Sequence, residues 1–395
     1  MDDYLSLPST HLSYKLQDWI GKRSTEENYR SSVEMLNDIL GLRIECSEVK
    51  RVIEQLSPMA STYYEEYPVP PRSKEGEKAQ GSHLCFGNDG KGVPIMRAER
   101  GAKETEVGRL MKGEKRGVKK QATVSVSFTF NPLVRTSEDI LQSLFKENVP
   151  KIDNKPRNVG DKPTNAGDKT DNRMSIGVHR RAFMGDQKKA ITYAIDQLMV
   201  REDAKNKDII ALVDCGNGLE EGILQAIEQK GLQNNIKAII ADIVHVSEYI
   251  WKGANAVLGE KSKLRTQWVR SILKDILEGG VSEVIKDLQK MKDKGDMKES
   301  ACEQLAVTIK YLENHKHKMA YDVYLKNGYP ISTGIIESTC GHLVKDRMED
   351  SGMRWSISGA QQILDLRAVN KNGDWKYLMD YVQIQNKPNL LKLAA

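Results

Sequence analysis

DIIALVDCGNGLEEGILQAIEQKGLQNNIKAIIAD, residues 208–242, is the stretch that decides the fold. Its two ends, DIIALVD and IKAIIAD, are continuous apolar runs that finish on an acid, a pattern typical of buried parallel strands. The segment between them is amphipathic at a helical period and closes on Gly231. The stretch therefore predicts a β-α-β unit.

A second stretch, QATVSVSFTFNP at 121–132, changes the period. Apolar and Ser or Thr side chains alternate strictly, which predicts an antiparallel strand that is buried on one face only. Together the two stretches predict an α/β fold, with a mixed sheet that is antiparallel first and parallel later, surrounded by helices. The residues expected on the buried face are Ala122, Val124, Val126, Phe128 and Phe130.

The segments outside this sheet differ in composition. Residues 1–68 space their apolar side chains at helical intervals and predict a small helical region, with a DNA-binding helix-turn-helix as an alternative. Residues 69–82 are rich in Pro, Gly and charge, which predicts a linker. Residues 148–172 repeat Gly-Asp-Lys and predict a disordered or looped insert. Residues 251–328 are helical in pattern, and 376–395 are expected to be a C-terminal tail.

Composition sets wide limits. The chain has 395 residues, enough for two or three domains, and a net charge of +5 that permits a nucleic-acid partner without requiring one. Its five cysteines form no CxxC pair, which favours reduced thiols over a disulfide framework or zinc ribbon. No apolar run approaches the ~18 residues of a membrane span. We therefore expect a cytoplasmic protein with no membrane partner.

Four acids stand where chemistry is expected. Asp214 and Asp242 end the two predicted parallel strands, where sites form in open α/β sheets. Asp89 lies in FGNDGKGVP, which indicates a Gly-rich turn, and Glu337 lies near the start of the stretch 333–355, ahead of Lys345, Arg347 and Arg354. Each acid alone could be only a helix cap. Together they would suit Mg²⁺, which prefers carboxylate oxygens, and two such ions serve displacement at phosphorus.

Six motifs along the chain belong together. They are DGKGVP (89–94), KGEKRGVKK (112–120), RTSEDI (135–140), VDCGNG (213–218), ADIVHVSEYIWKGANAVLG (241–259) and the stretch from TGIIESTCGH to NGDW (333–375). Together they resemble the DDE transposases of bacterial insertion sequences, particularly the ISKra-type group. The likeness runs from about Asp89 to Trp375 and is interrupted by the Gly-Asp-Lys insert. It implies a ribonuclease H-like core split into 83–250 and 329–375, with 251–328 as a helical insertion.

The resemblance also implies roles for single residues. Asp89, Asp214 and Glu337 fall on the catalytic, metal-binding triad, with Mg²⁺ as cofactor and Mn²⁺ as a substitute. Asp242 and His245, in DIVH, resemble the D-x-x-H signature of related hAT and Mutator-like enzymes and are expected to support the triad. The small residues after Asp214 leave room for metal, which favours it over Asp242 as second ligand, although position alone does not choose. A structural role for His245 stays open.

Basic residues are the expected DNA contacts. The alternative for each is a solvated basic face. The resemblance implies a transposase that cuts and joins the ends of its own element, acting on terminal repeats and target DNA as a nucleoid-associated homo-oligomer. A ribonuclease H-like nuclease without strand transfer and a catalytically dead DNA-binding relic are the alternatives. The expected contacts are Lys115, Arg116, Lys119, Lys120, Lys345, Arg347 and Arg354.

Overall fold

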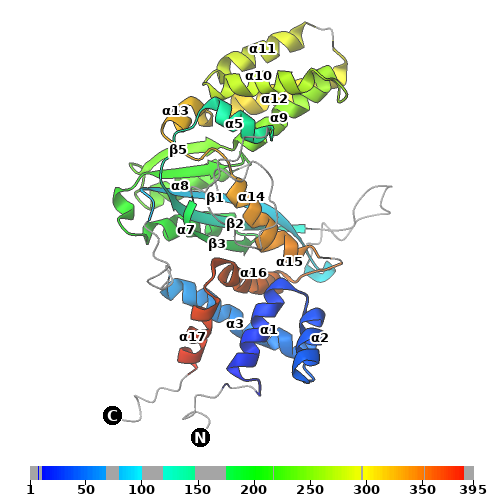
Figure 1. The fold of residues 1–395 in the computed structure, drawn as a ribbon, viewed down its shortest axis with the longest axis vertical. Coiled ribbons are helices and arrows are strands. Elements are labelled where there is room, and N and C mark those ends of the chain that lie inside the picture. Colours follow the sequence, from blue (N-terminus) through cyan, green and yellow to red (C-terminus); the bar gives the residue numbers. More distant parts are fainter. Residues whose placement is uncertain are drawn as a thin grey trace, which may run out of the picture.

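The computed structural model describes residues 8, 11–67, 80–99, 119–146, 175–216, 218–294, 297–350 and 352–386. Within them lies an α/β fold around a five-stranded mixed sheet of order β3-β2-β1-β4-β5 (Figure 1). β2 pairs antiparallel with β1 and β3, whereas β4 is parallel to both β1 and β5. This arrangement is compatible with a ribonuclease H-like core. The strands are β1 (His83–Pro94), β2 (Lys119–Phe130), β3 (Ser175–Met184), β4 (Ile209–Val213) and β5 (Ile236–Ala241).

Helices cover both faces of the sheet. α7 (Gln187–Met199) and α8 (Leu219–Gln229) pack on one face, and α8 joins β4 to β5, which confirms the predicted β-α-β unit. On the other face lie α14 (Gly334–Thr339), the π-helical turn η5 (Cys340–Lys345) and α16 (Ile357–Asn372). Short elements complete the connections: η2 (Arg97–Glu99), α5 (Ser137–Leu144), η3 (Ala204–Asn206), η4 (Lys316–Lys318) and α15 (Asp346–Met348).

Two helical groups lie at opposite ends of the molecule (Figure 1). The first joins the N-terminal helices to α17. The second follows β5 and contains no strand among the described residues of 251–328, so the predicted helical character of that range is confirmed. No helix in the described part of the chain has the length and apolar content to cross a membrane. The first group is α1 (Tyr14–Glu26), α2 (Tyr29–Leu40), α3 (Cys46–Glu66) and α17 (Trp375–Gln385); the second is α9 (Ile243–Leu258), α10 (Arg265–Leu277), α11 (Val281–Asp293), α12 (Glu299–His315) and α13 (Tyr321–Lys326).

β2 is buried on both faces, so the prediction of a half-buried strand is wrong. Every residue from Ala122 to Phe130 is buried, including the Ser and Thr side chains, because α7 covers their face. Hydrogen bonds make this burial tolerable. The Thr129 hydroxyl, for example, donates to the Ile176 carbonyl (3.2 Å) and accepts from the Gly81 N–H (3.0 Å). The alternation of apolar and hydroxyl side chains in β2 therefore reflects two faces with different coverings, both of them buried.

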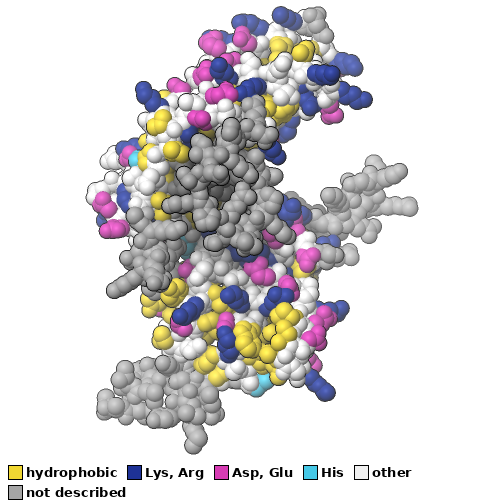
Figure 2. Space-filling view, viewed as in Figure 1, with side chains coloured by type: hydrophobic (Ala, Val, Ile, Leu, Met, Phe, Trp, Pro, Cys, Tyr) yellow, Lys and Arg dark blue, Asp and Glu magenta, His cyan; other side chains and the backbone are white. Residues whose placement is uncertain are grey.

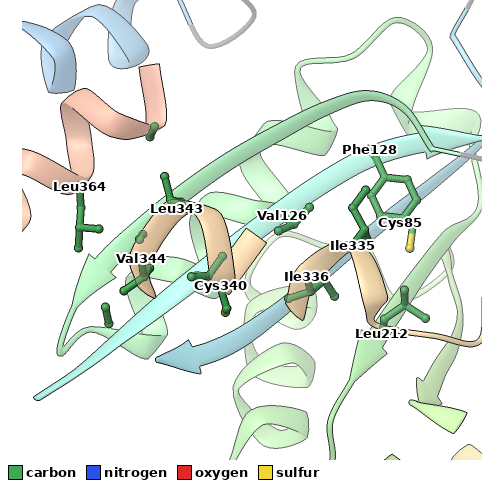
Figure 3. Close-up of a cluster of buried hydrophobic side chains, with 14 of the residues drawn as sticks. Cys85, Val126, Phe128, Leu212, Ile335, Ile336, Cys340, Leu343, Val344 and Leu364 are labelled. Carbon is green, nitrogen blue, oxygen red and sulfur yellow. The ribbon is translucent and has the colours of Figure 1, made fainter. Parts of the chain in front are cut away.

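The Gly-rich stretch around Asp89 is also a strand and not the predicted turn. β1 continues to Pro94 and pairs with β2 along its whole length. Its glycines allow close approach instead: a Cβ on Gly87 would lie 2.0 Å from Cδ1 of Ile336, on α14. Figure 3 shows Ile335 and Ile336 reaching down to the sheet beside Phe128, Cys85 and Leu212. Gly87 therefore sets how closely α14 can lie on the sheet.

The expected C-terminal tail is partly a packed helix. α17 buries Leu378, Met379 and Val382 and packs against α3. The ring of Trp375 lies beside Gly21 of α1, and its indole N–H donates to Asp18 (2.7 Å). The tail prediction is therefore wrong for 376–385, because apolar side chains there have a partner surface far away in the sequence. The Gly-Asp-Lys insert at 148–172 and most of the 69–82 linker lie outside the described residues.

A buried arginine joins the N-terminal helices to the core. The guanidinium of Arg367, on α16, donates to the carbonyls of His342 and Leu343 in η5, the latter at 2.8 Å. It also donates to the Thr25 carbonyl and to Glu26 Oε2 (3.0 Å), at the end of α1. One side chain thus satisfies acceptors from the π-helical turn and from α1. The N-terminal helices are therefore packed on the core and do not form a separate body.

Arg367→Met should lower the free energy of unfolding by about 3–5 kcal/mol, because three buried carbonyls lose their donor. Arg354→Met is the control: this arginine is exposed, and its loss should change stability by less than about 0.5 kcal/mol. Urea unfolding followed by circular dichroism measures both. Equal effects of the two substitutions would contradict the role given to Arg367.

Candidate functional site

Strand register brings three acids into one row. Gly87 of β1 pairs with Leu212 of β4, and Val213 of β4 pairs with Ala241 of β5. Continuing these registers places Asp89, Asp214 and Asp242 side by side on three adjacent strands, which lie about 4.8 Å apart. Asp214 and Asp242 directly follow β4 and β5, whereas Asp89 lies within the longer β1. Side chains alternate along a strand, so all three acids share the sheet face covered by α14, whose first turn carries Glu337.

Asp242 is fully buried and has both oxygens occupied. Its Oδ1 accepts from the N–H groups of Val244 (3.0 Å) and Thr333 (3.2 Å). Its Oδ2 accepts from His245 Nδ1 (2.8 Å) and the Thr333 hydroxyl (2.7 Å). Burial alone would raise the pKa of Asp242, but the bonds from His245 and Thr333 outweigh it and hold the pKa below its usual value. This carboxylate ties the start of α9 to the start of α14.

His245 lies between two carboxylates. Its Nδ1 is 2.8 Å from Asp242 Oδ2 and 3.6 Å from Glu337 Oε1. The hydrogen bond to Asp242 raises the pKa of His245 to about 9, against the opposing effect of burial. The imidazole is therefore charged at neutral pH, and it places a positive charge beside Glu337.

Glu337 carries a perturbed carboxyl group at the edge of solvent. Its Oε1 lies 3.2 Å from the Thr333 hydroxyl, and 41% of the side chain is exposed. Burial of the carboxyl group, followed by the nearby charge of Asp242, raises the pKa of Glu337 to about 7. The ligand atoms of Asp242, His245 and Glu337 lie within 4.8 Å of one another, so these three residues form one possible metal-binding group.

Asp89 and Asp214 lie beside this group and are less enclosed than Asp242. Asp89 accepts from the N–H of Gly90 (2.5 Å) and from the thiol of Cys340 in η5. Burial raises the pKa of Asp89, and the charge of Asp214 adds to the increase. Asp214 accepts from the N–H of Gly216 through Oδ1 (2.8 Å). The structure therefore brings the predicted residues Asp89, Asp214, Asp242, His245 and Glu337 into one region.

Arg347 is not available to DNA, and its prediction as a phosphate contact is wrong. Only 2% of it is exposed. Its Nε donates to the Ser24 carbonyl (3.0 Å), and its guanidinium lies 4.9 Å from the Trp355 ring centroid. Burial lowers the pKa of Arg347 to about 10. Its hydrogen bond to Ser24 ties α15 to α1, so this arginine is a structural residue.

The other basic residues differ in availability. Lys120, Lys345 and Arg354 are exposed, whereas the exposed Lys119 is paired with Glu349. Lys115 and Arg116 lie outside the described residues. On the face drawn in Figure 2, Lys and Arg side chains are spread over both helical ends and mixed with acids. The side chains coloured on this face therefore show no continuous basic strip at either helical end.

Sequence reasoning missed Thr333, the role of Cys340, and Lys91. Lys91 lies two residues after Asp89 on β1, so it shares the face of the acids. Its charge reaches Cys340 and Glu349, the second of which is also close to Lys345. The period of two between Asp89 and Lys91 was present in the sequence. It was hidden because the surrounding glycines indicated a turn.

No protein-family model matches this chain, and no curated protein is detectably similar to it. The likeness to DDE transposases therefore rests on the motifs quoted above. The case for a function rests on those motifs and on the geometry of the site.

Glu337→Gln should stabilise the folded protein at high pH but not at low pH, because the pKa of Glu337 is raised. The folded protein keeps a proton on Glu337 up to about pH 7, whereas the unfolded chain releases it near pH 4.5. The unmutated protein therefore loses stability as the pH rises from about 4.5 to about 7. An uncharged glutamine avoids this loss. In EDTA the variant should melt at a higher temperature than the unmutated protein at pH 8.

The difference in melting temperature should shrink towards zero as the pH falls to about 4.5. Glu228→Gln, at an exposed glutamate of α8, should shift the melting temperature little at either pH. Thermal unfolding across pH 4.5–8 provides the measurement. A gain for Glu337→Gln that does not change with pH would refute the raised pKa.

Proposed function

We propose that this protein is a DDE-type DNA transposase with a ribonuclease H-like core, which cuts and joins the ends of its own element. Asp89, Asp214 and Glu337 are the catalytic residues and the ligands of Mg²⁺, for which Mn²⁺ can substitute. One observation carries the proposal: Asp89 within β1, Asp214 directly after β4 and Glu337 on α14 converge on one face of the sheet. The quoted motifs support the same assignment.

The donor set fits a hard divalent cation. Mg²⁺ takes oxygen ligands and usually binds through a few carboxylates together with water and substrate phosphate. Asp89, Asp214 and Glu337 are each partly exposed. The raised pKa values of Asp89 and Glu337 show that negative charge is crowded and poorly solvated there, which a cation would relieve.

The contacts of Asp242 favour Asp214 as the second ligand. Asp242 already accepts four hydrogen bonds, so coordination would have to displace Thr333 or His245. Among the described residues, the N–H of Gly216 donates to Asp214 Oδ1, and no hydrogen bond to Oδ2 is present there, so this oxygen can serve as a ligand. We therefore assign Asp242 to positioning: it fixes Thr333, at the start of α14, and so fixes Glu337.

The proposed reaction is water attack on the phosphodiester at the element's end, followed by attack of the freed 3′-hydroxyl on target DNA. Two bound Mg²⁺ ions would supply activation of the attacking oxygen and neutralisation of the leaving oxygen. The chain itself contributes rigid placement, with two acids on buried strands and one on a helix pinned through Thr333. The charged His245 balances Glu337. Lys91 and Lys345, which both lie near Glu349, would contact phosphates of the bound DNA.

Asp214→Asn should abolish cleavage of a labelled element end while leaving DNA binding intact. Asp242→Asn should reduce cleavage by about 10–100-fold, the usual effect of losing a residue that orients metal ligands. Asp208→Asn is the matched control, since Asp208 precedes β4 at the opposite end of the strands and 40% of its side chain is exposed. The substrate is a labelled DNA end that carries an inverted repeat found by searching the DNA flanking the gene, and cleavage is measured with Mg²⁺ and with Mn²⁺.

The products also separate the alternatives. Joined target DNA identifies a transposase, whereas cut ends without joining would identify a nuclease. DNA binding without any cleavage, with either metal ion or without one, would identify a catalytically dead DNA-binding relic. Residual cleavage in Asp214→Asn with none in Asp242→Asn would reverse the assignment of the second ligand.

Replacing Lys91 and Lys345 together by Ala should weaken DNA binding and its salt dependence. Each lost phosphate contact lowers the slope of log affinity against log salt by about 0.9, so the double variant should lose about 1.8. The control is Lys205→Ala with Lys237→Ala, two exposed lysines at the opposite edge of the sheet. Fluorescence anisotropy across salt concentrations measures the slope. An unchanged slope in the Lys91 and Lys345 variant would show that these lysines are only solvated.

A further inference from the structure

The C-terminal part of the helical segment 251–328 contacts the chain close to Asp214 and Asp242. Tyr311, on α12, lies against the thiol of Cys215, the residue after Asp214. Lys318, in η4, donates to Glu220 in the first turn of α8 (2.5 Å). The Tyr321 hydroxyl, on α13, donates to the carbonyl of Ala241, the residue before Asp242 (2.8 Å). The helices thus hold the chain just after Asp214 and just before Asp242.

The backbone at Cys215 needs such support. Its φ of +62° lies in the left-handed region, which costs a non-glycine residue about 1–2 kcal/mol. Strained conformations persist only where the surroundings over-determine them. Tyr311 is itself fixed, because its ring stacks on Tyr249 with centroids 3.7 Å apart and planes 7° from parallel. The Thr308 hydroxyl in turn donates to the Tyr249 carbonyl (3.2 Å).

The contact at Glu220 is equally well defined. Lys318 is 2% exposed, and its ammonium group meets Glu220 Oε2, while His317 Nε2 lies 2.9 Å from Glu220 Oε1. A buried ammonium group without its partner is strongly unfavourable, so this pair fixes the distance between η4 and α8. Because α8 begins shortly after Asp214, fixing its first turn restricts the segment that carries Asp214.

We propose that Tyr311 and Lys318 are positioning residues for Asp214. The helical segment 251–328 would then shape the metal-binding site in addition to any contact with DNA. The inference rests on the proposed function, since it requires Asp214 to be a ligand of a divalent cation. Neither residue touches the substrate or the cation. Both act through the backbone that follows Asp214, Tyr311 at Cys215 and Lys318 at α8.

The test is the affinity of the full-length protein for Mn²⁺ without DNA, measured from the electron paramagnetic resonance signal of free Mn²⁺. Tyr311→Leu and Lys318→Met should each weaken Mn²⁺ binding by about 10-fold or more. Tyr311→Phe, which keeps the ring and its stacking on Tyr249, should retain most of the Mn²⁺ affinity that Tyr311→Leu loses. Tyr324→Phe is the control: this buried tyrosine of α13 contacts Tyr321 through its ring, which the substitution keeps, so the variant should bind Mn²⁺ as the unmutated protein does.

Lys318→Met leaves Glu220 unpaired and could unfold the protein, so the double variant Lys318→Met with Glu220→Gln removes the contact without an unpaired charge. Folding is checked by circular dichroism and thermal unfolding. Folded Tyr311→Leu and double variants with unchanged Mn²⁺ affinity would overturn the inference but leave the proposed function intact. If the unmutated protein bound no Mn²⁺, the proposed metal site would fail, and the inference would fail with it.

Discussion

The in-register parallel pairing of β1, β4 and β5 is the constraint on which the site depends. It aligns Asp89, Asp214 and Asp242 on one face of the sheet, although the residues are far apart in sequence. A slip of one residue would turn a strand's acid to the opposite face, under α7 and α8. Gly87 is the second constraint. Because it has no side chain, α14 can pack closely on the sheet, and this brings Glu337 near the three aspartates.

Electrostatics divide these acids into two kinds. Asp242 is buried but saturated with donors, so its charge is stable and its position is fixed. Asp89 and Glu337 are partly buried without equal compensation, and their pKa values are raised. A group that keeps unfavourable charge in the resting protein sacrifices stability for function, and perturbed carboxyl groups cluster at functional sites for this reason. These pKa shifts support metal binding by Asp89 and Glu337 and a positioning role for Asp242.

Sequence alone predicted the features that depend on local pattern, the β-α-β unit of 208–242 and the helices of 251–328. It failed where a distant partner decides. Arg347 looked like a DNA contact because its acceptor, the Ser24 carbonyl, lies 323 residues away. The Ser and Thr face of β2 looked exposed because alternation reports a difference between faces and not what covers them. The glycines beside Asp89 indicated a turn, whereas close packing of α14 and β2 explains them. The register that aligns the acids is a long-range property that no single stretch of sequence shows.

The central claim is that Asp89, Asp214 and Glu337, and not Asp242 with His245, hold the divalent cation. Anomalous diffraction from crystals grown with Mn²⁺ tests it most directly, because the anomalous peak locates the metal independently of activity. The account predicts a peak coordinated by carboxylate oxygens of Asp89 and Asp214 with Glu337 beside it, while the four hydrogen bonds to Asp242 remain in place. A peak bound by Asp242 and His245, with Thr333 displaced, would contradict the account.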